Sequence, residues 1–376
     1  MLNTMFPTIN RESSMLGFGC MRFPTTPDDK IDESEAIRMI RHAIDNGVRY
    51  IDTAYPYHGG ESEIVIGKAL KDGYREKVIL TTKLPVWLVK THEDMMKFLD
   101  EQLKKLDTPY VDFYILHAMN NERMDAMQKL DYKRFYAEAI AQGKVRYPGF
   151  SFHDDAKAFL RILHDWNQWG MCQVQMNILD DENQATLEGI REAGRRGVGV
   201  VVMEPLRGGL LANPPVDVKA VYDAYAVRRS PVEWGFRYLY AMPEVITILS
   251  GMSTWAQVTD NLRIFDMAKR PTLTDEELAL YQKVKATYLA RTKTRCTGCK
   301  YCQPCPMGVQ IPRIFQGYDA AMLRADSSFK AGYAQIQADH ADASQCIHCR
   351  KCEHVCPQHL PITRFLEEIH AVSTAE

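Results

Sequence analysis

The sequence predicts an α/β fold in which a (β/α)₈ TIM barrel is followed by a small cysteine-rich C-terminal domain. Eight short apolar, β-branched runs alternate with segments of helical periodicity, and eight of the ten cysteines lie in the last quarter of the chain. Eight strands alternating with helices over about 250 residues are typical of a closed parallel barrel. The alternative, a doubly wound open sheet, predicts a GxGxxG turn after the first strand, and no such turn follows Gly17 and Gly19.

Each predicted strand is a short, mostly apolar run, and an amphipathic segment follows most of them. Helix-start residues support the alternation. Asp32 or Ser34 precedes the first helical segment, and Thr91 with Asp94 forms a capping-box pattern after the third strand. The strands are predicted at residues 14–22, 48–54, 78–84, 111–117, 144–152, 171–177, 198–205 and 245–252.

A second part of the chain begins after residue 270. Residues 274–295 predict a helix, capped at Thr274 or Asp275, that leads out of the barrel. The residues that follow are rich in cysteine and proline, with one helical segment at 312–326 between two runs of thiols. We therefore expect two domains, a barrel at 1–285 and a C-terminal domain at 286–376.

Charge and composition exclude several classes of protein. The formal net charge of −2 gives no reason to expect a nucleic acid as a partner. No apolar run is long enough for a membrane span, and the first residues lack the apolar core of a signal peptide. In a chain of this size the thiols are expected to be metal ligands in a reducing compartment rather than disulfides. This pattern predicts a cytoplasmic protein.

Four polar residues lie at or just beyond the C-terminal ends of three successive predicted strands, where the reactive residues of barrel enzymes lie. Asp52 and Tyr57 follow the second strand, Lys83 ends the third, and His117 ends the fourth. A free tyrosine has a pKa of about 10, and a nearby ammonium lowers it. Lys83, held by Asp52, would thus help Tyr57 to donate a proton. His117 would orient a carbonyl while hydride arrives from a cofactor.

A few reactive or aromatic side chains lie outside these motifs. Trp87 and His92, after the third strand, either line a substrate site or are an ordinary loop aromatic and a helix-start residue. Cys20 and Cys172, which stand apart from the thiol runs, are expected to be small core residues.

Four segments carry the polar residues, and they resemble the successive signature segments of the aldo-keto reductase family. They are DTAYPYHGGESEIVIGKAL, ILTTKL, DFYILH and GKVRYPGFS, and the resemblance covers roughly residues 13–270. It implies an oxidoreductase that reduces a small-molecule carbonyl, or oxidises an alcohol, with NADP or NAD. It also implies a catalytic tetrad of Asp52, Tyr57, Lys83 and His117, in which Tyr57 rather than Tyr55 donates the proton.

The resemblance further implies which residues hold the dinucleotide. Ser151 and Gln175 would hold the carboxamide, the loop at 204–211 would follow the pyrophosphate, and the loop at 251–261 would hold the adenosine end. The implied cofactor-binding residues are Gly19, Cys20, Met21, Asp52, Ser151, Gln175, Met203, Glu204, Leu206, Arg207, Gly209, Gly251, Met252, Ser253, Gln257 and Asn261.

Four positions depart from the family's pattern. Phe152 replaces the asparagine that usually follows the serine, and Met203 replaces the aromatic residue that usually stacks on the nicotinamide. Gly251 and Gln257 stand where basic residues usually grip a 2′-phosphate. Two other arginines, Arg207 and Arg263, are candidates to bind the 2′-phosphate instead.

Two thiol runs near the C-terminus have the spacing of iron–sulfur ligands. The second run, CIHCRKCEHVCP, has the bacterial ferredoxin spacing, in which the fourth cysteine ligates the other cluster. The first run, CTGCKYCQPCP, has only two residues before its last cysteine. Zinc also takes four thiolates, but its sites usually use two CxxC pairs. The runs predict a ferredoxin-like domain with two [4Fe–4S] clusters, one bound by Cys296, Cys299, Cys302 and Cys356 and the other by Cys346, Cys349, Cys352 and Cys305.

The whole chain resembles the ferredoxin-fused branch of the family, and this combination allows three interpretations. Nicotinamide transfers hydride, two electrons at once, whereas iron–sulfur clusters pass single electrons. The barrel is therefore a nicotinamide-dependent reductase with structural or regulatory clusters, or it holds a flavin and its clusters connect it to a ferredoxin-like electron partner. In the third interpretation the barrel is silent and the tail is an electron carrier or redox sensor. The four polar residues favour an enzyme.

Overall fold

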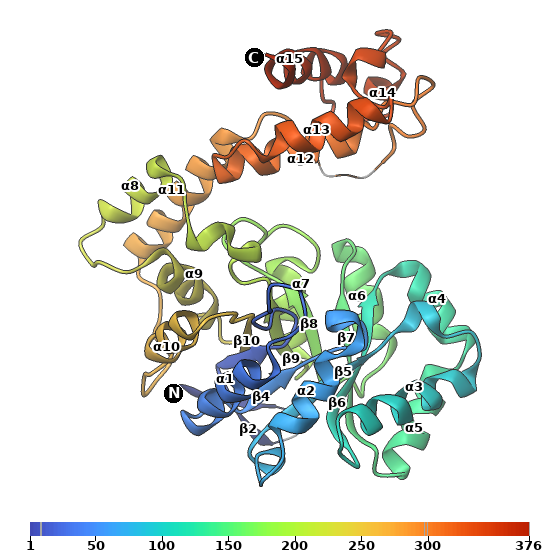
Figure 1. The fold of residues 1–376 in the computed structure, drawn as a ribbon, viewed down its shortest axis with the longest axis vertical. Helices are drawn as coiled ribbons and strands as arrows, with labels where there is room; N and C mark the ends of the chain where they lie inside the picture. The colour runs from blue at the N-terminus through green and yellow to red at the C-terminus, as the bar shows by residue number, and fades with distance from the viewer. Residues whose placement is uncertain (8–9, 297, 299, 376) are drawn as a thin grey trace. The chain divides into compact units, whose positions relative to one another are not determined.

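Eight parallel strands close into a barrel in the first part of the chain (Figure 1). The computed structural model describes residues 1–7, 10–296, 298 and 300–375. Its strand order, β10-β3-β4-β5-β6-β7-β8-β9, follows the sequence around the ring, and all eight predicted strands are confirmed. They are β3 (Leu16–Gly19), β4 (Tyr50–Asp52), β5 (Ile79–Leu84), β6 (Val111–Met119), β7 (Val145–Phe152), β8 (Met171–Gln175), β9 (Gly199–Met203) and β10 (Val245–Ser250).

The strands are mostly apolar and buried because both of their faces are covered. One face fills the barrel and the other lies under the helices, so β4, β5 and β10 are buried at every residue. Neighbouring strands approach closely where Gly17 stands, since a Cβ atom there would lie 2.7 Å from Thr247 Cγ2. The barrel interior is filled by Phe6, Tyr50, Ile79, Phe113, Ile115, Met171, Val201, Ile246 and Leu249.

An antiparallel hairpin that the sequence did not predict lies at the N-terminus. It pairs β1 (Asn3–Phe6) with β2 (Arg11–Ser14). The ring of Phe6 lies 5.0 Å from that of Phe113 and packs into the barrel interior. Arg11 donates to the carbonyl of Val78, immediately before β5. The hairpin therefore closes the barrel at the N-terminal ends of its strands.

Helices cover the outside of the barrel. Asp32 caps the first, accepting from Glu35 N at 3.1 Å, and the predicted capping box of Thr91 and Asp94 is present. The helices of this unit are α1 (Glu33–Asp45), α2 (Ser62–Ala69), α3 (His92–Lys105), α4 (Asn121–Lys129), α5 (Tyr132–Ala141), α6 (Ala156–Asp165), α7 (Thr186–Arg195), α9 (Pro231–Tyr240) and α10 (Trp255–Ile264).

The chain forms two compact units, one of residues 1–208 and 232–273 and the other of residues 209–231 and 274–376. The predicted boundary at 285 falls within helix α11, and the domain division stays a prediction. No helix in the described part of the chain is long and apolar enough to cross a membrane. The helices of the second unit are α8 (Val216–Asp223), α11 (Asp275–Arg291), α12 (Ile311–Arg324), α13 (Ser328–Ala338), α14 (Lys351–His354) and α15 (Ile362–Thr374).

The second unit has its own apolar core, formed mainly by α12, α13 and α15. Phe315, Tyr333 and Leu366 are buried in it. Cysteines of both thiol runs pack against this core, and Cys356 is part of it. Thr274, one of the two predicted caps, begins α11 with a capping box that includes Glu277. The helices thus hold the two thiol runs together although about forty residues separate them in the sequence.

Candidate functional site

The four polar residues that the sequence singled out meet at the C-terminal end of the barrel. Asp52 ends β4, Lys83 lies in β5 and His117 lies in β6, while Tyr57 begins the 3₁₀ helix that follows β4. Lys83 Nζ donates to Asp52 Oδ1 at 2.7 Å, to the Thr53 carbonyl at 2.7 Å and to Tyr57 Oη at 3.2 Å. An ammonium has three protons, so these three acceptors use all of them.

Tyr57 and Tyr55 have different surroundings. The ring of Tyr57 lies 6.1 Å from that of His117 and contacts the Lys83 ammonium. Tyr55 instead packs edge-on against Phe98, 5.4 Å away. Tyr57 is therefore the tyrosine that shares a site with Lys83 and His117.

Burial dominates the electrostatics of this site. It raises the pKa of Tyr57, and the Lys83 ammonium lowers that pKa by less, so the net shift is upward. The expected influence of Lys83 is present, but the expected net lowering is not. Burial also lowers the pKa of Lys83, and the charges of Asp52 and Tyr57 raise it by more. Lys83 is therefore charged and Tyr57 protonated at neutral pH.

His117 is held in the neutral state. Burial, followed by the cationic groups Lys83, His153 and Arg123, lowers the pKa of His117 to about 2. Its Nδ1 atom is buried and has no hydrogen-bond partner among the described residues. A neutral imidazole with an N–H available can donate a hydrogen bond to a substrate oxygen without giving up its proton.

Most residues expected to hold a dinucleotide lie at or after the C-terminal ends of barrel strands, while Gln257 and Asn261 lie in α10 and Gly209 belongs to the second unit, and their roles stay predictions. Ser151 Oγ accepts from Ala118 N at 2.7 Å, which leaves its own proton free. Gln175 is already engaged, donating to Asp180 at 2.8 Å and accepting from Gln184 at 2.7 Å. Those lying at the end of β3 are Gly19, Cys20 and Met21, and those on or after β9 are Met203, Glu204, Leu206, Arg207 and Gly209.

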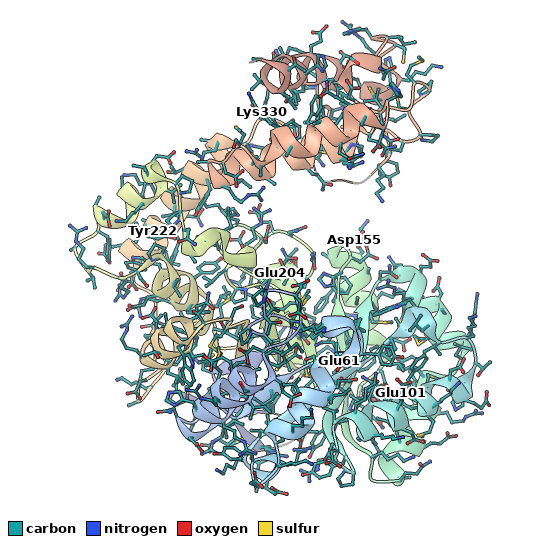
Figure 2. The ribbon with its side chains drawn as sticks, viewed as in Figure 1. Glu61, Glu101, Asp155, Glu204, Tyr222 and Lys330 are labelled. Atoms are coloured by element: carbon teal, nitrogen blue, oxygen red, sulfur yellow. The ribbon has the colours of Figure 1, made fainter. Side chains whose placement is uncertain are left out.

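Glu204, labelled in Figure 2, directly follows β9 and adopts a left-handed φ of 53°. After β10, Met252 and Asn261 are buried, and Asn261 donates to Ser250 Oγ at 2.8 Å. Gln257 accepts from the backbone of Ser253 and caps α10. These side chains have structural partners at the positions where the resemblance implies dinucleotide contacts.

The departures from the family's pattern have distinct surroundings. Phe152 is buried against Phe159, with ring centroids 5.2 Å apart. Arg207 forms an ion pair with Asp180 at 3.2 Å, and Arg263 forms one with Asp260 at 2.9 Å. Both candidate arginines are thus already paired with carboxylates.

Sequence reasoning missed Arg22, an exposed arginine beside the position of the missing basic residue. A Cβ atom on Gly251 would lie 3.2 Å from the Arg22 side chain, and one on Gly208 would lie 3.8 Å from its guanidinium. Within the described residues Arg22 forms no ion pair. The absence of a side chain at Gly251 thus makes room for the Arg22 side chain, whose charge also acts on Glu204, and places a guanidinium where a dinucleotide phosphate is expected. The only signal in the sequence was an arginine close to Gly19.

The loop after β5 also contributes to the site. Trp87 is 43% exposed, and its ring lies 5.1 Å from that of His117. His92 instead lies against α5, 2.8 Å from the Leu130 carbonyl and 3.4 Å from Glu138. Of the two residues left open by the sequence, Trp87 neighbours the tetrad and His92 is a helix-start residue with structural contacts.

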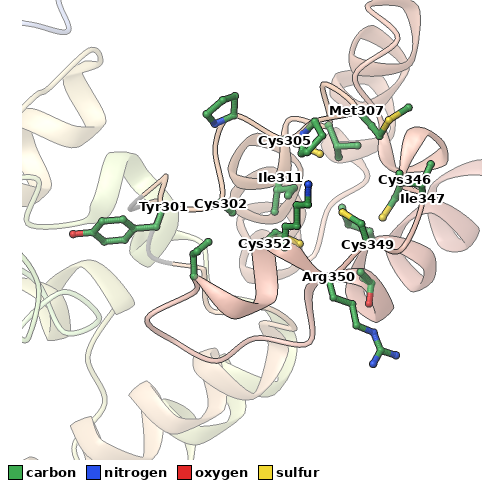
Figure 3. Close-up of a pocket in the computed structure, with 17 residues that line it drawn as sticks. Tyr301, Cys302, Cys305, Met307, Ile311, Cys346, Ile347, Cys349, Arg350 and Cys352 are labelled. Atoms are coloured by element: carbon green, nitrogen blue, oxygen red, sulfur yellow. The ribbon is translucent and has the colours of Figure 1, made fainter.

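Two cavities in the second unit separate the thiols into two groups. The larger, about 200 Å³, is lined by Cys305, Cys346, Cys349 and Cys352, whose side chains Figure 3 shows around a common space. The smaller, about 20 Å³, is lined by Cys296 and Cys356. Cys302 and Ile311 line both cavities. Cys299 lies outside the described residues.

The peptide backbone around Cys296 is fixed by a buried carboxylate on α12. Asp319 accepts from the backbone N–H groups of Lys293, Thr294 and Arg295 and from the Thr294 hydroxyl. Thr294 Oγ1 in turn accepts from Cys296 N at 3.2 Å. The backbone at Cys296 is thus held in place by the fold itself.

The barrel matches one oxidoreductase family. The model of the aldo/keto reductase family matches residues 15–286, more than half of the chain, and the chain belongs to this family. A second model, of the 4Fe-4S dicluster domain, matches residues 295–360.

Known proteins resemble the barrel at modest identity. The chain is 27% identical over 219 residues to "Probable aldo-keto reductase 1" of Glycine max, which covers 54% of this chain and 59% of the soybean protein, less than two thirds of its length. It is 24% identical over 312 residues to "Uncharacterized oxidoreductase YqkF" of Bacillus subtilis, covering 73% and 94%. The solved holo form of aldo-keto reductase AKR11C1 from Bacillus halodurans is 28% identical, covers 76% of this chain and 96% of that one, and has a TM-score of 0.64.

Proposed function

We propose that the barrel reduces a carbonyl compound, or oxidises the matching alcohol, with NADP or NAD, and that Tyr57 donates the proton. The observation that carries the proposal is the contact of Lys83 Nζ with Tyr57 Oη at 3.2 Å. Lys83 donates to the phenol oxygen, so the phenol proton points away from it and is available to a substrate oxygen. A bound nicotinamide supplies hydride to the carbonyl carbon.

The other members of the tetrad prepare this transfer. Asp52 keeps the Lys83 ammonium in place through the 2.7 Å ion pair. That ammonium stabilises the phenolate left after proton donation. His117, neutral because its pKa is about 2, donates a hydrogen bond to the carbonyl oxygen and orients it.

Tyr57→Phe tests the proposal, with Tyr55→Phe as the matched control. Loss of the proton donor is expected to lower kcat by roughly 10²- to 10⁴-fold, while the iron content and the far-UV circular dichroism stay unchanged. Tyr55 makes no contact with Lys83 or His117 in its described surroundings, so its substitution should leave kcat within a factor of a few. Full turnover by Tyr57→Phe would remove Tyr57 as the proton donor.

We further propose that the C-terminal unit holds two [4Fe–4S] clusters, with each thiol group lining one cavity. Three features of the chain support this: the ferredoxin spacing of the second run, the grouping of the described thiols other than Cys302 at one cavity or the other, and the Gly298 N–H that donates to Cys296 Sγ at 3.4 Å. Zinc, the alternative, would draw four sulfurs to about 2.3 Å from one ion. In the larger cavity the thiols instead surround a space of about 200 Å³.

A second candidate function is one-electron exchange with a ferredoxin-like partner. Among the described residues that line the larger cavity, Arg350 and Lys351 are charged and none is a carboxylate, although Glu353 and Glu367 lie close enough to act on Cys352 and Cys346. Tyr301 and Ile347, which also line it, are 68% and 61% exposed. A cationic rim with exposed apolar side chains beside a redox centre suits a small acidic electron carrier. In this reading a flavin in the barrel would couple the single electrons to substrate chemistry.

Two measurements separate the candidates. An absorbance spectrum of anaerobically purified protein shows whether a flavin is bound, and its presence would favour the electron-partner reading. Arg350→Glu with Lys351→Glu should then slow electron exchange with a reduced bacterial ferredoxin and reduce its salt dependence. Lys157→Glu with Lys283→Glu, two exposed substitutions on α6 and α11 that change the net charge by the same amount, is the control. Equal rates in both variants would reject this surface.

A further inference from the structure

Arg123 lies in the first turn of α4, close to the residue that follows His117. Its backbone N–H is bonded to the Asn120 side chain at 2.8 Å, and its guanidinium donates to the carbonyl of Ala118. The same guanidinium lies 5.4 Å from the centre of the Trp87 ring. These contacts, from three elements of the barrel unit, fix the position of the charge.

Arg123 ends a continuous row of side chains that begins at the proton donor. The Tyr57 ring lies 6.1 Å from His117, the His117 ring lies 5.1 Å from Trp87, and Trp87 lies under Arg123. Trp87 is 43% exposed, so the row is open to solvent along its middle. A molecule whose carbonyl lies at Tyr57 and His117 would therefore extend along Trp87 toward Arg123.

The charge at the end of this row is not neutralised. Among the residues that the structure describes, no carboxylate forms an ion pair with Arg123, whereas the other cation of the site, Lys83, is paired with Asp52. The plain alternative is that Arg123 only packs on Trp87 and ties down the Ala118 carbonyl. That role uses the face of the guanidinium and one of its five N–H groups, and it leaves the remaining N–H groups for a ligand.

We propose that Arg123 binds a carboxylate of the substrate and that Trp87 forms the apolar wall between this carboxylate and the reacting carbonyl. The substrate class is thus a carbonyl compound with a carboxylate a few bonds away, such as an aromatic or medium-length oxo-acid. A guanidinium presents parallel N–H groups that match the two carboxylate oxygens. The inference rests on the proposed carbonyl reduction and adds to it the class of molecule reduced.

The test compares two nearly isosteric pairs that differ in charge. 4-(Hydroxymethyl)benzoate and 4-(hydroxymethyl)benzamide are titrated for binding by calorimetry, and 4-carboxybenzaldehyde and 4-carbamoylbenzaldehyde are compared by kcat/KM. The wild type should favour the charged member of each pair by roughly 10-fold or more, the size of one charge-assisted hydrogen-bonded pair. Arg123→Gln should abolish that preference, and Arg123→Lys should keep part of it.

Lys129→Gln removes the same charge from the far end of α4, where the side chain is exposed, and should leave the preference intact. A wild type that binds benzoate and benzamide equally, or an Arg123→Gln variant that keeps the preference, would overturn the inference. A binding preference that Arg123→Gln abolishes supports it even where neither aldehyde is reduced, and absent reduction would count against the proposed function alone.

Discussion

At the scale of single residues, the charge state of the tetrad has a direct kinetic consequence. Burial raises the pKa of Tyr57, so the phenol keeps its proton through neutral pH and beyond the ordinary tyrosine value of about 10. His117, with a pKa of about 2, stays neutral down to acidic pH. Neither group changes its charge between these two limits.

We therefore expect neither Tyr57 nor His117 to change kcat/KM for carbonyl reduction between about pH 5 and about pH 9, because the free enzyme's pKa values govern this quantity. On the acid side the first group of the tetrad to titrate is Asp52, because burial raises the pKa of its carboxyl. Reduction needs the protonated phenol, so on the alkaline side the rate should fall only as pH rises past the elevated pKa of Tyr57. Stopped-flow assays at constant ionic strength measure the profile. A fall in rate below pH 7 that His117→Gln removes would show that His117 titrates and would contradict its assigned state.

The tetrad could be predicted from the sequence because the last residues of all strands in a parallel barrel lie at the same end of the barrel. Asp52, Lys83 and His117 could be read from position alone. Arg22 and Arg123 could not, since each becomes informative only through a neighbour from another loop: Gly251 in one case and Trp87 in the other. The net pKa of Tyr57 also escaped prediction, because it depends on how deeply the hydroxyl is buried.

At the scale of elements, the strands and caps were predictable and the N-terminal hairpin was not. Each barrel strand is a mostly apolar run bounded by turns, and this pattern can be recognised in the sequence without knowledge of the contacts. The hairpin strands have four residues each, and β2 reads Arg-Glu-Ser-Ser. Only Phe6 carries an apolar signal for the buried face, and its partners Tyr50 and Phe113 come from distant strands.

Helix α12 contributes a prediction at this scale. Asp319→Ala removes the acceptor for three backbone N–H groups and one hydroxyl just before Cys296. Each lost partner of a buried donor costs about 1–3 kcal/mol, so the segment should detach and the adjacent cluster should be lost. The expected iron content is about half that of the wild type, or about four fewer atoms per chain.

Asp339→Ala, an exposed carboxylate at the end of α13, is the matched control and should keep full iron. Iron and acid-labile sulfide are measured after anaerobic reconstitution. Asp319→Asn, which retains one acceptor oxygen, should lie between the two. Full iron in Asp319→Ala would mean that the cysteines alone hold the segment.

At the scale of the whole molecule, the cavity that a cysteine lines does not follow from the thiol run to which it belongs. Cys356 ends the second run but lines the smaller cavity with Cys296. Cys305 ends the first run but lines the larger cavity with Cys346. The sequence suggested this exchange by analogy with ferredoxins, and the cavities support it without testing the ligation itself.

Serine substitutions test the exchange. Cys356→Ser should leave the same residual electron paramagnetic resonance spectrum as Cys296→Ser, because both affect one cluster, and Cys305→Ser should match Cys346→Ser. Cys172→Ser, in strand β8, should leave the spectrum unchanged. If Cys356→Ser matched Cys346→Ser instead, each run would bind its own cluster.

The two cavities share Cys302 and Ile311, so little more than one side chain divides them. Centres this close would equilibrate with each other faster than with anything outside, and the unit would act as a single store. Two one-electron centres have a combined capacity of two electrons, which is what one nicotinamide delivers. The spacing set by Ile311 would therefore let two single electrons be taken up or released together. A bulkier or smaller residue at that position would change the rate of electron transfer between the two centres.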